Sequence, residues 1–246
     1  MSKFTPPKKL SVVVPVRNEQ DNVAPLIAEI DAALKHMAHE IIYVNDGSTD
    51  TTQARLESLQ SQYPQLRIVR HAHSCGQSTA VRTGVKAAQY DWVATLDGDG
   101  QNDPADIPKL IAALEEGVEL VGGNRRQSRR DTWVKRMSSV IANTVRSKML
   151  RDDTPDTGCG LKLFSKAAFL DLPYFDHMHR FLPALIKRRG GQIRSVHVNH
   201  RNREFGRSNY GTLDRLMVGI VDLFGVAWLQ RRAKLPVVLD NNTDKK

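Results

Sequence analysis

The sequence predicts an α/β fold in which helices cover both faces of a mostly parallel sheet. Five short apolar runs rich in β-branched residues recur through residues 10–121, and amphipathic segments separate them. This alternation favours right-handed crossovers between parallel strands. The 246 residues suffice for one sizeable core, so we expect a single main domain. We divide the chain into an N-terminal arm, this domain, an amphipathic helical segment and a polar tail, at residues 1–9, 10–212, 213–235 and 236–246.

The five predicted strands of the first half are continuous apolar runs, a pattern typical of strands buried on both faces of a sheet. In the first half of the chain they cover residues 10–16, 40–45, 66–70, 91–96 and 118–121. Two further strands are expected in the second half, at residues 161–164 and 192–199.

The predicted helices have apolar residues three and four positions apart. They cover residues 22–37, 51–63, 78–89, 104–116, 133–150 and about 180–189. Two of them begin with start signals, because Asp50 is followed by Gln53 three residues later and Asp103 precedes Pro104. A capping role explains the presence of Asp50, so no ligand contact is assigned to it. Asp103 is likewise not assigned as a metal ligand.

The role of the C-terminal helical segment stays open at the level of sequence. A helix over residues 213–229 places seven apolar residues on one face, which three charged residues interrupt. Spanning a membrane takes about 20 mostly apolar residues, so this segment is not expected to span. It either lies in a membrane interface, with Trp228, Arg231 and Arg232 near the headgroups, or packs on the sheet.

Positive charge is concentrated in two segments. The sequence has 36 Lys and Arg residues against 27 Asp and Glu, a formal net charge of +9. Residues 125–151 hold nine basic side chains and one acidic, and residues 180–215 hold nine basic and two acidic. This segregation indicates a phosphate-rich ligand or an anionic membrane.

The cysteine content and the N-terminus indicate a cytoplasmic protein. Cys75 and Cys159 are the only cysteines and show no C-x-x-C spacing, so neither is assigned a role. The apolar stretch near the N-terminus is too short for a secretory signal. We therefore expect a reducing cytoplasm, with the protein peripheral at the inner face of the membrane.

Polar side chains follow three of the predicted strands. Asp97-Gly98-Asp99 comes after the fourth strand, Asp46 after the second, and Asn18-Glu19 after the first. Ligands of parallel α/β sheets bind outside the carboxyl ends of the strands, so these groups are expected to share one site. Two carboxylates on alternate residues can bind one hard divalent cation, which in turn binds a diphosphate. Asp-Gly is also a common turn, and it is the convergence of three strand ends that favours the site.

The segment from Gly76 to Gly84 begins a helix with small residues, which lets its N-terminus approach an anion. It matches neither G-x-G-x-x-G nor the phosphate loop G-x-x-x-x-G-K-[ST], and the segment after the first strand has no glycine. Dinucleotide cofactors and P-loop ATPase chemistry are therefore disfavoured. A metal at Asp97 and Asp99 is the remaining means of holding phosphates.

Five motifs occur in order along the chain. Beginning at Pro15, Val44, Asp97, Asp156 and Arg203, they read PVRNE, VNDGSTD, DGDGQ, DTGCGLK and REFGRSNY. Over residues 10 to about 215, they resemble family 2 glycosyltransferases of the GT-A fold, which has a Rossmann-like sheet. The motifs look most like those of the polyprenyl-phosphate sugar transferases, the branch typified by dolichyl-phosphate mannose synthase.

The resemblance implies a nucleotide-sugar donor, a Mg²⁺ or Mn²⁺ ion and contacts at the matching positions. The donor would be bound by Pro15, Val16, Asn18, Glu19, Asp46, Gly76 and Asp97. The metal would be held by Asp97, Asp99 and Gln101, and the catalytic set would be Asp97, Asp99 and Asp156. The chain departs from the family at Asn209, where relatives commonly carry lysine, and in lacking the C-terminal transmembrane segments of many relatives. These departures weaken the expectation of a phosphate contact at that position and of stable membrane anchoring.

The resemblance further implies an inverting transfer, in which the acceptor oxygen attacks the anomeric carbon opposite the leaving nucleoside diphosphate. For an undecaprenyl- or dolichyl-type polyprenyl phosphate acceptor, the second ionisation lies at about pH 6, so the attacking oxygen is already anionic and needs no strong base. Guanidinium groups match phosphate geometry. The acceptor phosphate would be bound by Arg125, Arg130, Arg203 and Arg207.

Two alternatives remain. A sugar hydroxyl as acceptor, in polysaccharide or glycolipid synthesis, would require Asp156 as the base. The net charge suggests a nucleic-acid-binding protein, but only 6% of the chain is aromatic and no aromatic motif interleaves with the arginines, so nucleic acid is not expected. The expected partners are the nucleotide-sugar donor, polyprenyl phosphate, a membrane surface and, in a homo-oligomer, a second copy of the chain. The sugar and its nucleotide, UDP or GDP, stay open.

Overall fold

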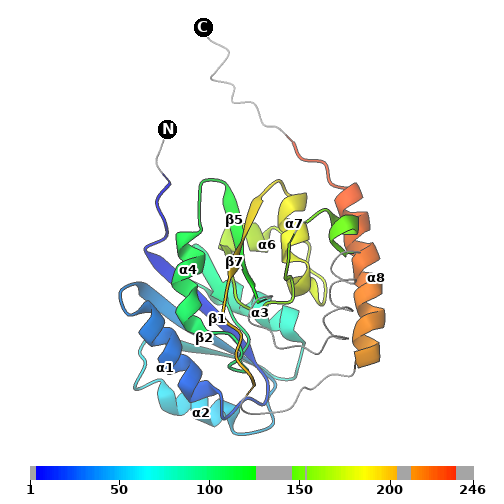
Figure 1. Ribbon diagram of the computed structural model, residues 1–246. Coiled ribbons are helices and arrows are strands. Elements are labelled where there is room, and N and C mark those ends of the chain that lie inside the picture. Colours follow the sequence, from blue (N-terminus) through cyan, green and yellow to red (C-terminus); the bar gives the residue numbers. More distant parts are fainter. Residues whose placement is uncertain (1–3, 126–145, 153, 204–211, 237–246) are drawn as a thin grey trace.

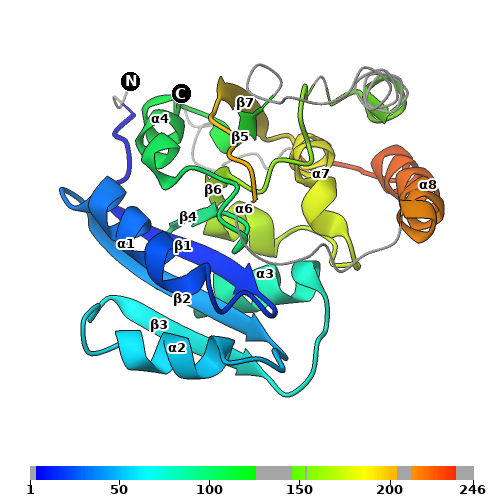
Figure 2. The ribbon, with the colours of Figure 1, turned by 60° about the horizontal axis from the view of Figure 1, so that its bottom comes forward.

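The computed structural model describes residues 4–125, 146–152, 154–203 and 212–236, with the side chains of residues 212–217 excepted (Figure 1). These residues form a seven-stranded sheet in the order β3-β2-β1-β4-β6-β5-β7. Helices lie on both faces of the sheet (Figure 2). The predicted α/β class is confirmed.

The first half of the chain alternates strand and helix as the sequence predicts. Its elements are β1 (Lys9–Val16), α1 (Val23–Leu34), β2 (Ala38–Asp46), α2 (Thr52–Leu59), β3 (Leu66–His71), α3 (Gln77–Ala87) and β4 (Trp92–Thr95). The helices end a few residues before their predicted bounds, whereas the strands agree closely.

The second half contains shorter elements. They are the 3₁₀ turn η1 (Pro104–Asp106), α4 (Ile107–Ala112), β5 (Val118–Asn124), β6 (Lys162–Ser165), α6 (Lys166–Leu170), the 3₁₀ turn η2 (Met178–Arg180), α7 (Leu182–Arg188), β7 (Gln192–His197) and α8 (Thr212–Arg231). Residues 146–150 are helical, and the rest of the helix predicted at residues 133–145 lies outside the described residues. Helix α6 is not among the elements predicted from the sequence.

One strand of the sheet runs against the others. β6 pairs antiparallel with both β4 and β5, whereas the pairs β1–β2, β1–β4, β2–β3 and β5–β7 are parallel. The carboxyl ends of β1, β2 and β4 therefore lie at the same edge of the sheet. This edge carries the polar residues that the sequence placed after these strands.

Alternate residues of the central strands enter two different hydrophobic cores. On β1, Val12 and Val14 belong to the core covered by α1 and α4, whereas Val13 belongs to the core covered by α3, α6 and α7. All three side chains are 0% exposed. A strand buried on both faces has no polar side to display, which explains the continuous apolar run in the sequence.

The expectation that the five strands of the first half are buried on both faces is wrong for β3, which lies at an edge of the sheet. β7 is an edge strand in which most side chains, including those of Arg194 and Ser195, are exposed. β3, at the other edge, is mostly half-buried. An edge strand has a neighbour on one side only, so helices cover it less completely.

Helix α8 lies alongside α7 at one side of the molecule (Figures 1 and 2). Val226 and Ala227 are buried against the second core, and the Gln230 side chain donates to the Ala184 carbonyl at 3.3 Å. The described part of the helix thus packs on α7. In the part of the chain that the structure describes, no helix has the length and apolar character needed to cross a membrane.

Candidate active site

A cleft of about 660 Å³ opens at the carboxyl ends of β1, β2 and β4. Residues from both halves of the chain line it. Among those predicted from the sequence, the lining includes Pro15, Val16, Glu19, Asp46, Asp97, Asp99, Gln101 and Arg203. The structure therefore brings together the three acidic strand ends.

Asp97 and Asp99 sit where the chain leaves β4. The Asp97 backbone N–H donates to Asn102 Oδ1 at 3.0 Å, and Gln77 Nε2 donates to Asp97 Oδ1 at 2.7 Å. The turn passes so close to β1 that a Cβ on Gly98 would lie 2.3 Å from Val16 Cγ1. Burial and the charge of Asp99 raise the pKa of Asp97. The acidic pair is thus held in place with its charges incompletely balanced.

Gly160 makes room for the Asp97 carboxylate. A Cβ at this position would lie 2.2 Å from Asp97 Oδ2 and 2.4 Å from Cγ, far inside van der Waals contact. The Gly160 carbonyl also accepts a hydrogen bond from Thr95 Oγ1 at 3.0 Å, which ties the loop before β6 to β4. The fourth sequence motif therefore contributes to the site by lying against the third.

Arg203 connects the first and third motifs. Its guanidinium donates to Glu19, and its second nitrogen lies 4.0 Å from Asp99 Oδ2. Glu19 also accepts from Asn22 Nδ2 at 2.6 Å. Burial raises the pKa of Glu19, although both hydrogen-bond donors act in the opposite direction. Arg203 is thus a cation of the cleft that faces acidic side chains, and its contact with acceptor phosphate stays a prediction.

The chemistry of this acidic corner fits a hard divalent cation. Its donors are the carboxylates of Asp97 and Asp99 and the amide of Gln101, all of which offer oxygen. The Gln101 backbone N–H donates to Asp99 Oδ1 at 3.2 Å, which keeps the short turn together. Because burial and the charge of Asp99 raise the pKa of Asp97, a cation bound at this corner would stabilise the ionised carboxylates.

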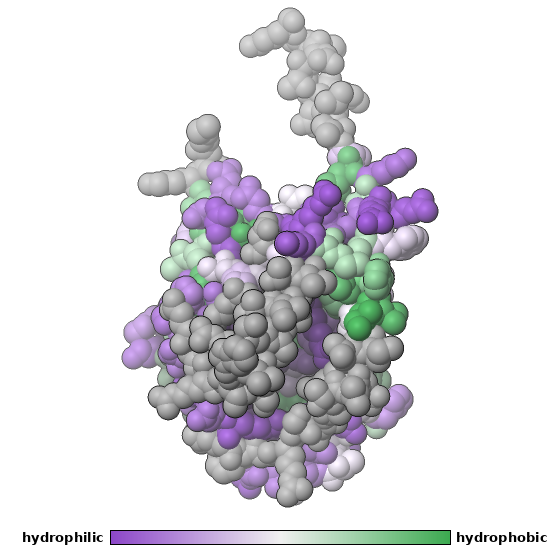
Figure 3. All heavy atoms as spheres, turned by 45° about the vertical axis from the view of Figure 1, so that its right-hand side comes forward, coloured by the Kyte–Doolittle hydropathy of each residue, from purple (hydrophilic) through white to green (hydrophobic). Residues whose placement is uncertain are grey.

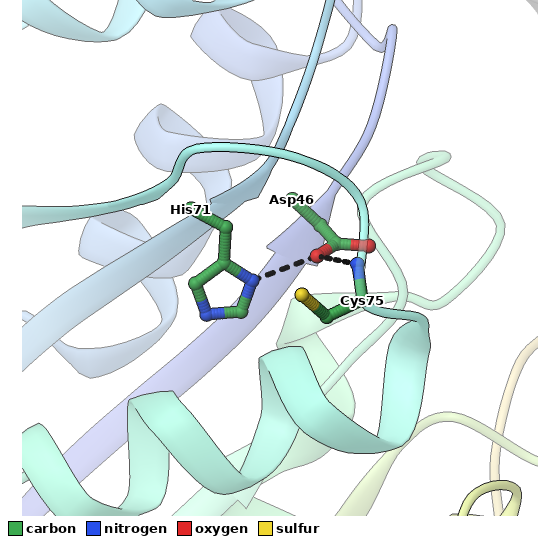
Figure 4. A group of neighbouring side chains, drawn as sticks. All are labelled: Asp46, His71 and Cys75. Carbon is green, nitrogen blue, oxygen red and sulfur yellow. Dashed lines mark hydrogen bonds and ion pairs between the residues drawn. The ribbon is translucent and has the colours of Figure 1, made fainter.

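Asp46 is held by a different network (Figure 4). Its oxygens accept from His71 Nδ1 at 2.7 Å, Ser74 Oγ at 2.7 Å, the Cys75 N–H at 2.8 Å and the Gly76 N–H at 3.0 Å. Burial alone would raise the pKa of Asp46, but these hydrogen bonds hold it below its usual value. The carboxylate therefore orders the loop between β3 and α3, in addition to lining the cleft.

Two predicted donor contacts lie just outside the cleft lining. Asn18 accepts from the Thr49 N–H at 2.8 Å and so joins the loops after β1 and β2. Gly76 donates its N–H to Asp46 and begins α3. Both residues therefore hold in place the loops beside the cleft and do not face it.

Asp156 and Arg125 form a buried pair and do not line the cleft. Arg125 Nε donates to Asp156 Oδ2 at 2.8 Å, and Arg125 Nη2 donates to Oδ1 at 3.0 Å. Both residues are 8% exposed. This geometry differs from the predicted roles, in which Arg125 binds acceptor phosphate and Asp156 faces the reacting centre. The other two predicted phosphate ligands, Arg130 and Arg207, lie outside the described residues.

Several polar residues that line the cleft had no predicted role, among them Gln77, Lys162 and His179. Gln77 holds Asp97, and the buried Lys162 donates to the Cys159 carbonyl. Burial lowers the pKa of Lys162 and brings that of His179 well below its usual value; His179 Nδ1 lies 2.7 Å from Ser78 Oγ. Gln77 lies in the glycine-containing segment that begins at Gly76, and Lys162 ends the DTGCGLK motif. The sequence around His179 contains no motif that would indicate a place in the cleft.

Comparison with known proteins identifies the family. A model of glycosyl transferase family 2 matches residues 11–172. The chain is 33% identical over 234 residues to dodecaprenyl-phosphate galacturonate synthase of Rhizobium johnstonii, covering 93% of this chain and 69% of that protein. It is also 33% identical over 216 residues to undecaprenyl-phosphate 4-deoxy-4-formamido-L-arabinose transferase of Serratia proteamaculans, covering 87% and 66%. The chain thus spans about two thirds of the length of these relatives.

Solved structures share the fold. Glucosyl-3-phosphoglycerate synthase from Mycobacterium tuberculosis, in complex with Mn²⁺, UDP and glucosyl-3-phosphoglycerate, superimposes with a TM-score of 0.67 at 21% identity, covering 93% of this chain and 81% of that chain. The same enzyme with Mg²⁺ and UDP gives a TM-score of 0.66, covering 93% of this chain and 80% of that chain. At this identity the match concerns the fold alone. With the family model, the curated relatives and the five motifs in agreement, the chain belongs to glycosyl transferase family 2 and is a glycosyltransferase.

Proposed function

We propose that the protein transfers a sugar from a nucleoside-diphosphate donor to a polyprenyl phosphate, with inversion at the anomeric carbon. The observation that carries this proposal is the cleft, in which the acidic ends of β1 and β4 face basic residues from the second half of the chain. Two relatives are a dodecaprenyl-phosphate synthase and an undecaprenyl-phosphate transferase, which supports a polyprenyl phosphate acceptor.

The donor diphosphate is assigned to the corner formed by Asp97, Asp99 and Gln101. A Mg²⁺ or Mn²⁺ ion bound there would supply positive charge that stabilises the leaving diphosphate. Gln77 orients Asp97 by hydrogen bonding, and Arg203 balances charge beside Asp99. The fold neighbours crystallised with UDP and either Mn²⁺ or Mg²⁺, which supports the choice of ligands.

An anionic acceptor suits the carboxylates of the cleft better than a hydroxyl does. Those that line its described part are Glu19, Asp46, Asp97 and Asp99. Asp97 and Asp99 are assigned to the metal, Asp46 accepts four hydrogen bonds, and Glu19 accepts from Asn22 and Arg203. None of these four is therefore placed as a base for a hydroxyl. A phosphate monoester carries its own negative charge, since its second ionisation lies at about pH 6.

Transfer assays with labelled donors test this function. The protein is incubated with Mn²⁺, undecaprenyl phosphate in detergent and a panel of UDP- and GDP-linked sugars that includes UDP-galacturonate, and the mixture is extracted with organic solvent. We expect label in the organic phase with one donor, dependent on both Mn²⁺ and the lipid phosphate. Label that enters only water-soluble or glycolipid products through a sugar hydroxyl would contradict the proposed acceptor.

We further propose that the exposed face of α8 contacts the membrane that contains the acceptor. Val221, Phe224 and Trp228 are 68%, 63% and 58% exposed and follow each other at spacings of three and four residues, so they share one face. Arg232 stacks over the Trp228 ring, with 5.9 Å between its Cζ and the ring centroid. Figure 3 shows hydrophobic residues gathered on this side of the molecule next to strongly hydrophilic ones. An apolar face beside basic residues is the arrangement of interfacial helices.

Replacing Phe224 and Trp228 together by Ser is expected to weaken binding to vesicles of phosphatidylcholine and phosphatidylglycerol by about tenfold or more. Each large apolar side chain contributes about 1.5–3 kcal/mol when fully buried, and partial insertion of two suffices for that factor. Cosedimentation with sucrose-loaded vesicles measures the change. Tyr174→Ser, which alters an exposed aromatic residue outside α8, is the matched control. Equal binding of the double variant and the control would contradict the assignment.

A further inference from the structure

Three side chains of different chemistry meet beside the cleft, at the ends of β2 and β3 and just before α3 (Figure 4). They are Asp46, His71 and Cys75, and one ligand atom of each lies within 4.8 Å of the others. Asp46 is buried, His71 is half-buried and Cys75 is exposed. The group is therefore open to solvent on the side of the thiol.

The donor set of this group differs from that of the acidic corner. A carboxylate oxygen, an imidazole nitrogen and a cysteine sulfur are the three ligand types that Zn²⁺ takes in proteins, usually in tetrahedral geometry. Mg²⁺ and Mn²⁺ prefer oxygen ligands, which is the set offered by Asp97 and Asp99. Three protein ligands leave a fourth tetrahedral position, which water can occupy on the exposed side.

The surroundings of His71 and Asp46 also suit ligands of a metal ion. His71 Nδ1 faces Asp46 Oδ1 at 2.7 Å, while His71 Nε2 lies 3.0 Å from Thr83 Oγ1. With Nδ1 bound to a cation, the imidazole proton resides on Nε2 and is donated to the Thr83 hydroxyl. Metal-binding histidines commonly donate their second N–H in this way.

Asp46 keeps its support when the cation replaces the proton between it and His71. The Cys75 N–H still donates to Oδ1, and Ser74 Oγ and the Gly76 N–H still donate to Oδ2. These contacts fix the carboxylate in a single orientation. Only the thiol proton of Cys75 leaves for solvent, because the ligand must be the thiolate.

We propose that Asp46, His71 and Cys75 form a second metal site, which takes a borderline divalent cation such as Zn²⁺ and is separate from the acidic corner at Asp97 and Asp99. The site lies where Asp46 lines the cleft. An ion bound there takes up space and adds positive charge at the wall of the cleft, so it is expected to alter nucleotide binding.

Cobalt titration tests the site without any measurement of transfer. Protein treated with a chelator is titrated with Co²⁺, whose bond to a thiolate gives a charge-transfer absorption band in the near ultraviolet. We expect this band to saturate at one ion per chain and to disappear when Zn²⁺ is added. Cys75→Ser should abolish the band, and His71→Ala should weaken Co²⁺ binding by about tenfold or more.

The matched control is Cys159→Ser, which removes the other cysteine, a buried one, and should leave the band unchanged. Cys75→Ser alters an exposed side chain by a single atom, and its thermal unfolding should match that of the wild type. Absence of the band in the wild type, or its persistence in Cys75→Ser, would overturn the proposal.

The effect on the nucleotide is a separate measurement that rests on the proposed function. Zn²⁺ is expected to lower the affinity for UDP, measured by calorimetry in the presence of Mn²⁺, severalfold more in the wild type than in Cys75→Ser. Equal effects in both proteins would assign the action of Zn²⁺ to the acidic corner. Equal effects would also overturn the link between this site and nucleotide binding. Whether the metal site exists is tested separately by the cobalt band.

Discussion

Replacing Asp97 by Asn is expected to remove most sugar transfer and to leave the fold intact. The amide has nearly the size of the carboxylate, and its oxygen can still accept the hydrogen bond from Gln77. The substitution removes one of the two negative charges that face the proposed metal. Charge stabilisation by such an ion contributes several kcal/mol, and about 3 kcal/mol corresponds to about 100-fold in rate. We therefore expect kcat to fall by at least about 100-fold, with weaker binding of Mn²⁺.

The stability of Asp97→Asn should not fall with its activity. The pKa of Asp97 is raised by burial and by Asp99, so the metal-free protein loses stability as the pH rises through this pKa and the carboxylate ionises. The amide avoids this charge. At neutral pH and in the presence of a chelator, the Tm of Asp97→Asn is expected to equal or exceed that of the wild type.

Steady-state kinetics with a Mn²⁺ titration, together with thermal unfolding, measures both effects. Asp91→Asn is the matched control, because Asp91 is exposed just before β4 and lies outside the cleft lining. It should change neither kcat nor the Mn²⁺ dependence. An Asp97→Asn variant with wild-type transfer would contradict the metal assignment.

The central strands of the sheet could be predicted because burial on both faces gives each of them a run of apolar residues in the sequence. β1 divides Val12 and Val13 between two cores, so successive residues of the strand are apolar. The direction of β6 has no such local mark. Its four residues, Lys162–Ser165, place two apolar side chains between two polar ones, a pattern that is the same in either direction. Only pairing with β4 and β5 makes the strand antiparallel.

The candidate site was predictable to the extent that sheet topology decides it. Strand ends at the same edge meet wherever the strands are parallel, so Glu19, Asp97 and Asp99 line one cleft. The sequence pattern does not indicate contacts between loops that lie far apart in the chain. His179 meets Ser78 across 101 positions of sequence, and Arg125 meets Asp156 across 31. Nothing in the spacing of these residues indicates which arginine pairs with a carboxylate and which faces a ligand.

Asp156→Asn is expected to destabilise the protein by about 3 kcal/mol. The Arg125 guanidinium donates two hydrogen bonds to the carboxylate, and both side chains are about nine-tenths buried. The amide removes the negative charge that this buried arginine faces, and breaking a buried pair by removing one member typically costs about 3–5 kcal/mol. Urea unfolding measures the loss. The double variant Arg125→Met/Asp156→Leu removes both charges and should recover much of it.

The same variant separates a structural role of Asp156 from a catalytic one. A general base contributes about 10²–10⁴-fold to rate, so loss of a base would lower kcat even in fully folded protein. Because the carboxylate is bound by Arg125 and does not line the cleft, we expect the kcat of folded Asp156→Asn to fall by less than about tenfold. The assay is run well below the Tm of the variant, so that the folded fraction is the same as in the wild type. A fall beyond about 100-fold under these conditions would make Asp156 the base and would favour a sugar hydroxyl over a lipid phosphate as the acceptor.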